Sequence, residues 1–462
     1  MTLAAGSEHE LRFTDLLANG QGVGRADGLV VFVWGPLPEE RARVRIVEVK
    51  KAYAVGELLE ILEASPERTT PFCPVFGTCG GCQVQHLSYE AQLRWKSRVV
   101  QDALKRIGGF EGARVEPTVG MPSPRAYRNK MALVVRRQDS ETQFGFYQMR
   151  SHDFVPIAGC PVVLPQLDEE IAALRHAAND GELTEAFEGA LHAIARAGSA
   201  TGQSVLTLTT AEPSSSLRRG AAALARRLPG LVGISNSFAV RSANAIMGSR
   251  HRDVWGGSTI EERIGNLRYR VSAASFFQIN TEMVARIFDE LETLSHPKRV
   301  VDLYCGAGTF SIWFAAHGAQ VTGIEDNPSA IREANANAAL NGVATQTKFV
   351  LGRVEGALAR GPLRDALENV DVVFLDPPRK GCEPQTLDVL VAANVPAIWY
   401  LSCNPATLAR DLARLHGAGY RLESVKPYDM FPQTGHVETL ATMRRRTQPE
   451  GGSAMDDARP GS

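Results

Sequence analysis

Two short motifs near the C-terminus bring a thiol and a carboxylate into one chain. Cys403 lies in Ser-Cys-Asn-Pro at residues 402–405, and Glu438 ends the stretch Phe-Pro-Gln-Thr-Gly-His-Val-Glu at residues 431–438. A thiolate that adds to C6 of a pyrimidine makes C5 nucleophilic, and a base must then remove the C5 proton before the thiol can leave. An inert buried cysteine and a solvated glutamate are the plainer alternatives. The pair predicts C5 methylation of a pyrimidine, with Cys403 as nucleophile and Glu438 as base.

A glycine turn between two strand patterns indicates a nucleoside-binding site. Residues 299–304 form an apolar strand pattern, Gly306 and Gly308 follow, and the next strand ends in Glu325. Glycines allow close approach of the backbone, and a carboxylate at this place can accept both ribose hydroxyls. A dinucleotide enzyme would have a third glycine where this chain has Ser311. The pattern favours S-adenosylmethionine over NAD, and a structural turn without a cofactor is the alternative.

A later strand pattern, 370–376, ends in Asp376 and continues with two prolines and Arg379. An acid at a rigid strand tip can hydrogen-bond the edge of a base. Enzymes that methylate exocyclic amines carry a similar element, but an aromatic residue follows it and their reaction needs no thiol. This chain has Arg379 in place of the aromatic residue, and the Cys403 and Glu438 motifs favour C5 chemistry. Phe276 or Phe277 could supply a stacking surface, although adjacent phenylalanines are otherwise most simply core residues.

Four cysteines form a candidate metal site. Cys73, Cys79 and Cys82 share one glycine-rich loop, and Cys160 is the obvious fourth ligand because the remaining cysteines lie in the C-terminal motifs. Four thiolates suit either a [4Fe–4S] cluster or structural zinc. Spacing alone does not separate the two, although zinc sites more often show two Cys-x2-Cys pairs and this chain has one.

Composition is that of an ordinary globular protein, with 44% hydrophobic and 22% charged residues in 462. This length predicts two to three domains. No apolar stretch is long enough for a membrane span and no leader pattern is present, so we expect a cytoplasmic protein without membrane contact. The net charge of −1 gives no support to nucleic-acid binding. A local basic surface could come from two groups, or these could merely be solvated: Arg41, Arg43, Arg45, Lys50 and Lys51, and Arg125, Arg128 and Lys130.

The strand and helix patterns predict a modular α/β protein. Residues 10–62 predict a five-stranded barrel of the oligonucleotide-binding type. Residues 88–107 predict a helix, and 125–270 are mainly β with helical insertions near 167–197 and 214–228. From 271 onward helices and strands alternate as in a doubly wound, Rossmann-like domain. We therefore expect domains at 1–64, 65–270 and 271–446, with the 88–107 helix able to pack on the last, and a disordered tail at 447–462.

Taken together, these motifs resemble the RNA uracil-C5 methyltransferase family, which forms 5-methyluridine in bacterial 23S rRNA and tRNA. The resemblance spans nearly the whole chain except residues 165–260. The matching elements are the N-terminal barrel, the four cysteines, Ser-Phe-Phe-Gln-Ile-Asn at 275–280, Asp-Leu-Tyr-Cys-Gly-Ala-Gly-Thr at 302–309, Asp-Pro-Pro-Arg at 376–379, Ser-Cys-Asn-Pro at 402–405 and Gly-His-Val-Glu at 435–438.

The resemblance implies an S-adenosylmethionine-dependent methyltransferase domain, an RNA-binding TRAM barrel and a [4Fe–4S] cluster rather than zinc. It implies a monomer that flips the target uridine out of its RNA. Members specific for tRNA generally lack both the barrel and the cluster cysteines, so 23S rRNA is favoured and tRNA is the alternative. The implied cofactor or base contacts are Gln278, Tyr304, Gly306, Gly308, Thr309, Glu325 and Asp376, with Phe276 and Asp376 on the base. Tyr304 replaces a phenylalanine of some members, and Cys305 and Cys382 have no implied role.

Two other classes of function stay open at this point. A barrel on a nucleoside-binding scaffold could be a non-catalytic RNA-binding protein, although the presence of Cys403 and Glu438 argues against it. An iron–sulfur radical enzyme would need an open iron and a three-cysteine motif, commonly Cys-x3-Cys-x2-Cys. Here the first spacing is x5 and a fourth cysteine is available. Methylation of RNA that needs no reductant would distinguish the predicted activity from both.

Overall fold

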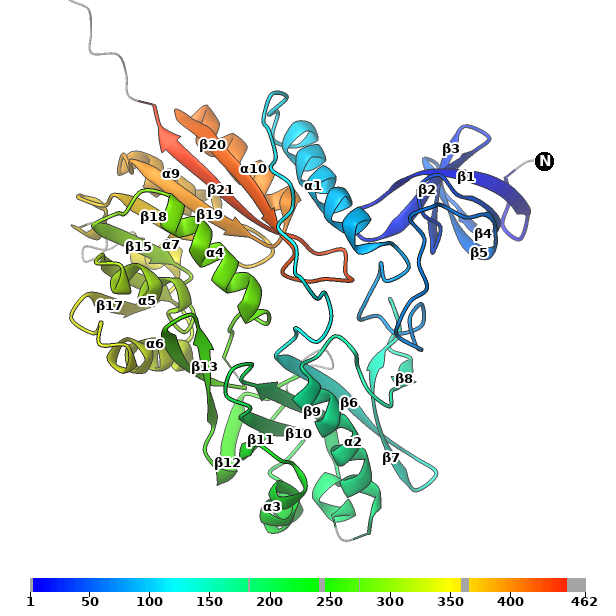
Figure 1. Cartoon of the computed structure of the whole chain (residues 1–462), viewed down its shortest axis with the longest axis horizontal. Coiled ribbons are helices and arrows are strands. Elements are labelled where there is room, and N and C mark those ends of the chain that lie inside the picture. The colour runs from blue at the N-terminus through cyan, green and yellow to red at the C-terminus, as the bar shows by residue number, and fades with distance from the viewer. Residues whose placement is uncertain (1–2, 182, 241–245, 274, 359–364, 447–462) are drawn as a thin grey trace, which may run out of the picture.

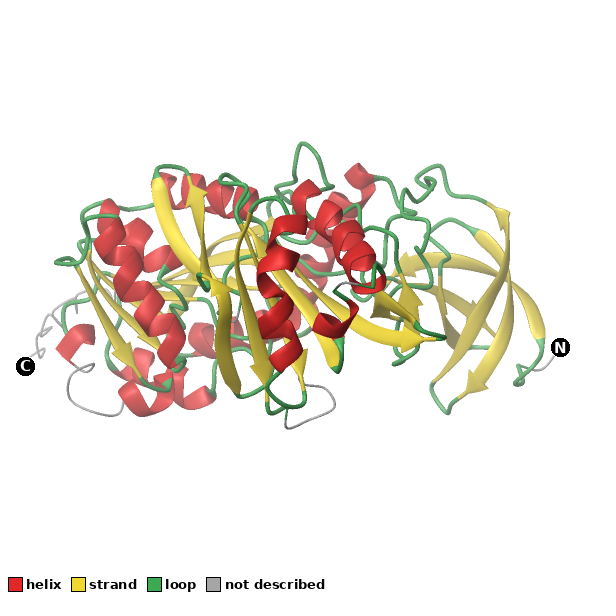
Figure 2. Cartoon of the chain, turned by 90° about the horizontal axis from the view of Figure 1, so that it is seen from below, coloured by secondary structure: helices red, strands yellow, loops and turns green. Residues whose placement is uncertain are grey.

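The computed structural model describes residues 3–181, 183–240, 246–273, 275–358 and 365–446 (Figure 1). The tail predicted to be disordered, 447–462, lies outside these residues. A small barrel stands at one end, a mainly β region follows, and a doubly wound sheet carries the C-terminal part (Figures 1 and 2). This architecture confirms the predicted fold class. None of the helices in the described ranges combines the length and apolar character needed to cross a bilayer.

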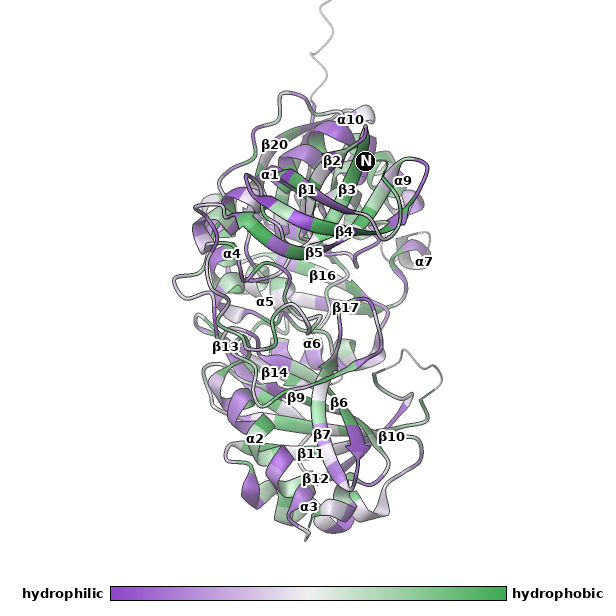
Figure 3. Ribbon diagram, turned by 90° about the vertical axis from the view of Figure 1, so that its right-hand side faces the viewer, coloured by the Kyte–Doolittle hydropathy of each residue, from purple (hydrophilic) through white to green (hydrophobic). Residues whose placement is uncertain are grey.

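The N-terminal region is a closed five-stranded barrel with strand order β1-β2-β3-β5-β4. Val31 and Val33 point into the barrel and are fully buried, whereas Phe32 and Trp34 between and after them are partly exposed. This alternation is what a half-buried strand requires. The strands are β1 (Glu8–Leu16), β2 (Gln21–Ala26), β3 (Leu29–Trp34), β4 (Arg41–Val49) and β5 (Tyr53–Glu63). Hydrophilic and hydrophobic residues both occur along these strands (Figure 3).

The long helix α1 (Tyr89–Arg106) begins after the cysteine-containing loop and packs against the C-terminal sheet region. Its buried residues Val100 and Leu104 join the core formed by β18, β19 and α10. Figure 1 shows α1 beside α10 and β20, far along the chain. The helix therefore joins the N-terminal part of the chain to the part that carries Cys403 and Glu438.

The central region is a seven-stranded sheet with strand order β12-β11-β10-β9-β6-β7-β8. The helical insertion predicted near 167–197 is wrong in its second half. Helix α2 (Pro165–Asn179) and a 3-10 turn, η1 (Thr184–Phe187), are followed by strand β9 (Ala190–Ala197), which pairs with β6 and β10 on its two sides. Sheet pairing overrides the helical preference of the alanines in this segment. The other elements are β6 (Lys130–Gln138), β7 (Glu141–Tyr147), β8 (Phe154–Pro156), β10 (Ser204–Thr210), α3 (Ser215–Arg227), β11 (Leu231–Phe238) and β12 (Arg250–Gly256).

A hairpin and helix α4 lead into a second seven-stranded sheet, ordered β17-β16-β15-β18-β19-β21-β20. Its first five strands are parallel, and β21 joins β19 antiparallel. The predicted boundary at 270 falls inside β14, so the division into domains remains a prediction. The elements are β13 (Thr259–Ile264), β14 (Leu267–Ser272), α4 (Thr281–Thr293), β15 (Arg299–Leu303), α5 (Thr309–Ala316), β16 (Gln320–Glu325), α6 (Pro328–Leu340), β17 (Thr347–Leu351), α7 (Val354–Leu358), β18 (Val372–Leu375), α9 (Pro384–Ala392), β19 (Ala397–Ser402), α10 (Pro405–Gly417), β20 (Tyr420–Tyr428) and β21 (Glu438–Arg445).

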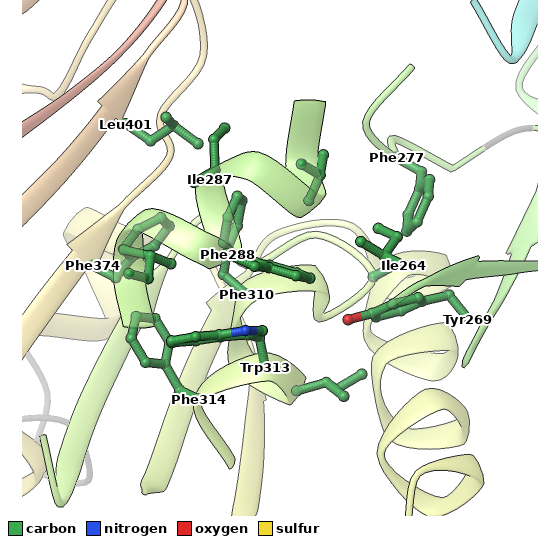
Figure 4. Close-up of a cluster of buried hydrophobic side chains, with 14 of the residues drawn as sticks. Ile264, Tyr269, Phe277, Ile287, Phe288, Phe310, Trp313, Phe314, Phe374 and Leu401 are labelled. Atoms are coloured by element: carbon green, nitrogen blue, oxygen red, sulfur yellow. The ribbon is translucent and has the colours of Figure 1, made fainter. Parts of the chain in front are cut away.

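An aromatic core fixes helices α4 and α5 to one face of this sheet (Figure 4). The ring of Phe310 lies 4.6 Å from that of Phe374 on β18, and Phe288 stacks on Trp313 at 5.6 Å. Buried aromatic pairs of this kind contribute both area and preferred geometry. They hold the glycine turn before α5 in a fixed position relative to the strand ends.

Candidate active site

Strand pairing brings Cys403 and Glu438 to the same edge of the C-terminal sheet. Cys403 directly follows β19 and Glu438 begins β21, and the antiparallel register pairs Ser402 with Thr439. The two residues therefore lie next to each other across neighbouring strands. In parallel register, Leu375 pairs with Tyr400, so Asp376 follows β18 at the same edge. A thiol and two carboxyl groups from three segments meet there.

Glu438 is buried, Asp376 is partly buried, and the charge of Asp376 acts on Glu438. Burial, with the charge of Asp376 as the second cause, raises the pKa of Glu438 well above its usual range. Glu438 Oε1 has no hydrogen-bond partner among the described residues. Burial and then Asp302 raise the pKa of Asp376 to about 8, which a 3.1 Å hydrogen bond from Gln278 Nε2 to its Oδ2 partly opposes. Carboxyl groups in such surroundings are stronger bases when ionised.

The thiol of Cys403 is partly exposed and protonated at neutral pH in this state. Burial raises its pKa to about 12, with further contributions from Glu438 and Asp376, while Arg379 acts in the opposite direction. Such charge effects are strong only between groups a few ångströms apart. Cys403, Glu438 and Asp376 therefore lie close together.

An extended residue separates Cys403 from helix α10. Asn404 has φ −136° and ψ 103°, and Pro405 begins α10. The residue before a proline ordinarily avoids the α region, as Asn404 does. The Asn404 side chain accepts a hydrogen bond from the Ala406 amide and donates one to the Arg379 carbonyl, at 3.1 and 2.9 Å. It thereby ties the loop after Asp376 to the segment that carries Cys403.

The glycine turn lies at the ends of β15 and β16. Gly306 and Gly308 have φ values of +54° and +84°, and Tyr304 also adopts a positive φ of +68°. Such values favour glycine, and a non-glycine residue there indicates local strain. Glu325 Oε2 accepts a hydrogen bond from the Gly306 amide at 3.1 Å, and its other oxygen accepts one from Asn327. The acid and the turn are thus joined, as a nucleoside site requires.

The two adjacent phenylalanines have different surroundings. Phe277 is buried and its ring lies 5.6 Å from Tyr269, as expected of a core residue. Phe276 is 67% exposed, and its ring lies within 4 Å of where a Cβ on Gly306 would be. An exposed aromatic ring beside the glycine turn is available to a ligand. The core interpretation therefore fits Phe277 and not Phe276.

Sequence reasoning missed the residues that hold the loop before Glu438. Lys96 and Asp429 form a fully buried ion pair at 2.5 Å, and Lys96 Nζ also donates to the Phe431 carbonyl at 3.1 Å. Gln92, one turn before Lys96 on α1, binds Gln433. The sequence carried one signal for these contacts: Gln92 and Lys96 are polar residues four positions apart on the apolar face of the predicted helix. We refer to residues 429–437 as the base loop.

The four cysteines of the predicted metal site line one cavity of about 360 Å³. Burial raises the pKa of Cys82 to about 12 and that of Cys160 to about 11, and each is raised further by neighbouring thiols of the set. Within the described part of the chain, no three His, Cys, Asp or Glu side chains are close enough together to hold a metal ion. The donor types fit a thiolate-ligated centre, and the structure supports no more than this shared cavity.

Three arginines of the predicted basic group on the barrel are engaged in ion pairs. Arg41, Arg43 and Arg45 each pair with carboxylates on the neighbouring strands, at 2.9, 3.1 and 3.2 Å for the shortest contacts. In the second group, Arg125 lies over the Phe72 ring at 4.0 Å. The side chains of these arginines therefore already make contacts within the protein. The net charge of −1 agrees with the pairing of opposite charges on this part of the surface.

A doubly wound sheet with a glycine turn and a strand-end acid at its carboxyl edge defines an S-adenosylmethionine-dependent methyltransferase fold. Residues 256–446 match the family model described as tRNA (Uracil-5-)-methyltransferase, and residues 4–59 match the TRAM domain. An uncharacterized RNA methyltransferase of Halalkalibacterium halodurans is 37% identical over 94% of this chain and 96% of its own. Another, from Thermosynechococcus vestitus, is 38% identical over 95% and 98%.

A solved structure agrees with these similarities. The Pyrococcus abyssi tRNA (uracil-54, C5)-methyltransferase, crystallised with S-adenosyl-L-homocysteine, superposes with a TM-score of 0.75 and 28% identity. The match covers 94% of this chain and 99% of that one. The chain belongs to the RNA (uracil-5)-methyltransferase family. It is an S-adenosylmethionine-dependent RNA methyltransferase with an N-terminal TRAM domain, as the sequence predicted.

Proposed function

We propose that the protein methylates C5 of a uridine in 23S rRNA through a covalent bond between Cys403 and C6 of the base. The observation that carries this proposal is the pairing of β19 with β21, which sets Cys403 beside Glu438 at the open edge of the sheet. No direct methylation of an amine needs a thiol in this position. The shared electrostatics of Cys403, Glu438 and Asp376 support the same assignment.

In this mechanism the flipped uracil lies against Phe276, with its polar edge toward Asp376. At a pKa of about 8, Asp376 keeps its proton at neutral pH and can both donate and accept a hydrogen bond. Cys403 gives up its thiol proton to water and adds to C6 as the thiolate, and the electron pair of the C5–C6 double bond moves toward C5 and O4. C5 then takes the methyl group as the bond of that group to the sulfonium sulfur of the donor breaks, which leaves a neutral thioether. Glu438, ionised, removes the C5 proton, the C5–C6 double bond re-forms, and the thiolate leaves.

S-adenosylmethionine would supply the electrophilic methyl group. Gly306 and Gly308 would allow the backbone to approach it, since glycine carries no side chain and adopts their left-handed conformations without strain. Glu325 would accept hydrogen bonds from the ribose hydroxyls, because each of its oxygens uses only one lone pair within the protein. The remaining contacts that we assign to the cofactor are Gln278, Tyr304, Thr309 and Asp376.

The four cysteines would hold a [4Fe–4S] cluster rather than zinc. Cys73, Cys79, Cys82 and Cys160 line one cavity, and the base-loop residues Phe431, Thr434 and His436 line it too. Such a cluster would carry four thiolates that are otherwise costly to bury together. Its role would be structural, to hold residues 73–82 in place against the base loop.

Transfer RNA is the second candidate substrate. The Pyrococcus abyssi enzyme that matches 94% of this chain is a tRNA (uracil-54, C5)-methyltransferase. Because this match covers nearly the whole chain and not the catalytic domain alone, the presence of a barrel is weaker evidence for rRNA over tRNA. Mapping 5-methyluridine in rRNA and tRNA from cells with and without the protein tests both candidates. Loss of one 23S rRNA site supports the proposal, and loss of a tRNA site supports the alternative.

Methyl transfer in vitro tests the reaction class. Labelled S-adenosylmethionine should methylate RNA from cells that lack the protein, with no reductant present, and the label should be found in 5-methyluridine. A strict requirement for a reductant, or label in an exocyclic amine, would contradict the proposal.

A further inference from the structure

The barrel has two chemically different faces. On one face, which we call the arginine ladder, Arg41, Arg43 and Arg45 of β4 alternate with glutamates of β1 and β5. Arg41 contacts both Glu10 and Glu63 at 2.9 Å. The members of the ladder are Arg12, Arg41, Arg43, Arg45, Glu8, Glu10, Glu57, Glu60 and Glu63. Because acids outnumber arginines there, this face offers no net attraction to a phosphate chain.

The other face, on β3 and β5, carries aromatic side chains, which we call the aromatic strip: Phe32, Trp34 and Tyr53. The neighbours of Phe32 on β3, Val31 and Val33, are buried, so its ring must point outward, and it lies 5.6 Å from the Tyr53 ring at an angle of 53°. All three residues are partly exposed. The strip therefore keeps part of its surface in contact with solvent.

Cations flank the aromatic strip. Lys50 lies 5.9 Å from the centre of the Tyr53 ring, although it also contacts Glu48 at 3.3 Å. Arg25, on β2 opposite Val30, is exposed and has no ion-pair partner among the described residues. Aromatic rings beside positive charges form the surface on which unpaired nucleotides stack, with the phosphates near the cations.

At Trp34 the aromatic strip contacts the central region of the protein. Arg150, which follows β7, lies 5.0 Å from the centre of that ring and donates to Gln21 at 3.1 Å. The end of β7 also contacts the loop that carries Cys73, Cys79 and Cys82. The Gly80 amide in that loop donates a hydrogen bond to the Tyr147 carbonyl at 3.0 Å. That loop in turn contacts the base loop. An RNA strand on the strip would therefore lie on the side of the barrel that leads toward Glu438.

We propose that unpaired nucleotides of the substrate RNA stack on Phe32 and Tyr53, and that the arginine ladder makes no contact with RNA. The proposal rests on the proposed function to the extent that the bound RNA is the one methylated. It identifies the recognised feature as single-stranded RNA, since every base has a face that can stack and no base edge is needed.

Binding of a fluorescein-labelled oligouridylate of about twelve nucleotides to the full-length protein tests this, because a barrel of this type covers about 4–16 nucleotides. Phe32→Ala and Tyr53→Ala should each weaken binding about tenfold, whereas Phe32→Tyr and Tyr53→Phe keep a ring and should bind like the wild type. Arg43→Gln in the ladder is the matched control and should leave the affinity unchanged. Arg25→Gln should reduce the slope of log affinity against log salt concentration by about one.

Binding of S-adenosylmethionine and the unfolding midpoint show whether each variant is folded. Wild-type affinity in the folded double variant Phe32→Ala/Tyr53→Ala would overturn the proposal, as would loss of binding in Arg43→Gln. Preference for a duplex over the oligouridylate would overturn it too. Methyl transfer to RNA is measured separately with the wild-type protein, so failure of the proposed function and failure of the aromatic strip give different results.

Discussion

Gln92 and Gln433 bind each other through two reciprocal hydrogen bonds. Gln92 Nε2 donates to Gln433 Oε1 at 3.0 Å, and the Gln433 backbone amide donates to Gln92 Oε1 at 3.1 Å. Gln433 has a positive φ of +71°, which a non-glycine residue keeps only when its surroundings hold it there. Because Glu438 begins β21 only five residues later, this contact fixes the start of the strand that carries the proposed base.

Gln92→Ala should lower activity more than its effect on folding explains. It leaves the buried Gln433 amide and the carbonyl oxygens of Val84, Leu87 and the Gln433 side chain without their Gln92 partner, at a cost of about 1–3 kcal/mol for each buried group left unpaired, and it frees the base loop. Gln101→Ala on the same helix is the control, since that side chain makes two partly buried hydrogen bonds, to Ala113 and Val115, and does not contact the base loop. Gln92→Ala should lose more stability in urea than Gln101→Ala, and among molecules that stay folded only Gln92→Ala should lower kcat. Equal kcat values would contradict a positioning role.

Asp376→Asn should stabilise the protein at pH 8 and not at pH 4. The folded-state pKa of Asp376 is raised from 3.8 to about 8, so its favourable contribution is present below pH 3.8 and is lost as the pH rises toward 8. An asparagine cannot ionise, so the variant should gain at least about 1 kcal/mol at pH 8 relative to the wild type. Urea unfolding at both pH values measures this. Asp388→Asn, in an exposed ion pair on α9, should show no such gain.

Alkylation of Cys403 by iodoacetamide should be slow without RNA and should accelerate with pH. Because its pKa is raised to about 12, the thiolate fraction grows about tenfold for each pH unit up to that value. Mass spectrometry of the peptide that contains Cys403 follows this residue alone. A rate that levels off near pH 7 would show that the thiol is already activated in the free protein.

Local patterns in the sequence predicted much of the fold because they depend on neighbouring residues. The barrel, the 88–107 helix and the strand ending in Glu325 were all found in this way. Alanine content misled the prediction for 190–197, where sheet pairing decides the structure. Contacts between distant segments, such as Lys96 with Asp429, could not be predicted, since nothing in either segment identifies the other. The glutamate partners of the barrel arginines were hidden for the same reason.

Protein purified without oxygen should be brown and contain iron and sulfide in about equal amounts. Cys79→Ser should lose that iron and lower the yield of folded protein more than it lowers the turnover of the surviving molecules. Cys305→Ala is the control, because Cys305 lies buried in the glycine turn, away from the cysteine cavity. It should keep the iron. Colourless wild-type protein with one bound zinc would contradict the [4Fe–4S] assignment.

The most direct test of the account is where the reaction stops in two variants, seen as a covalent enzyme–RNA adduct on denaturing gels. Cys403→Ala should form no adduct and no product, since nothing adds to C6. Glu438→Gln should add to C6 and accept the methyl group but keep the C5 proton, so a methylated adduct should accumulate. Wild-type protein should be trapped in the same way by RNA that contains 5-fluorouridine. Normal turnover by Glu438→Gln, or an adduct formed by Cys403→Ala, would contradict the assignment of nucleophile and base.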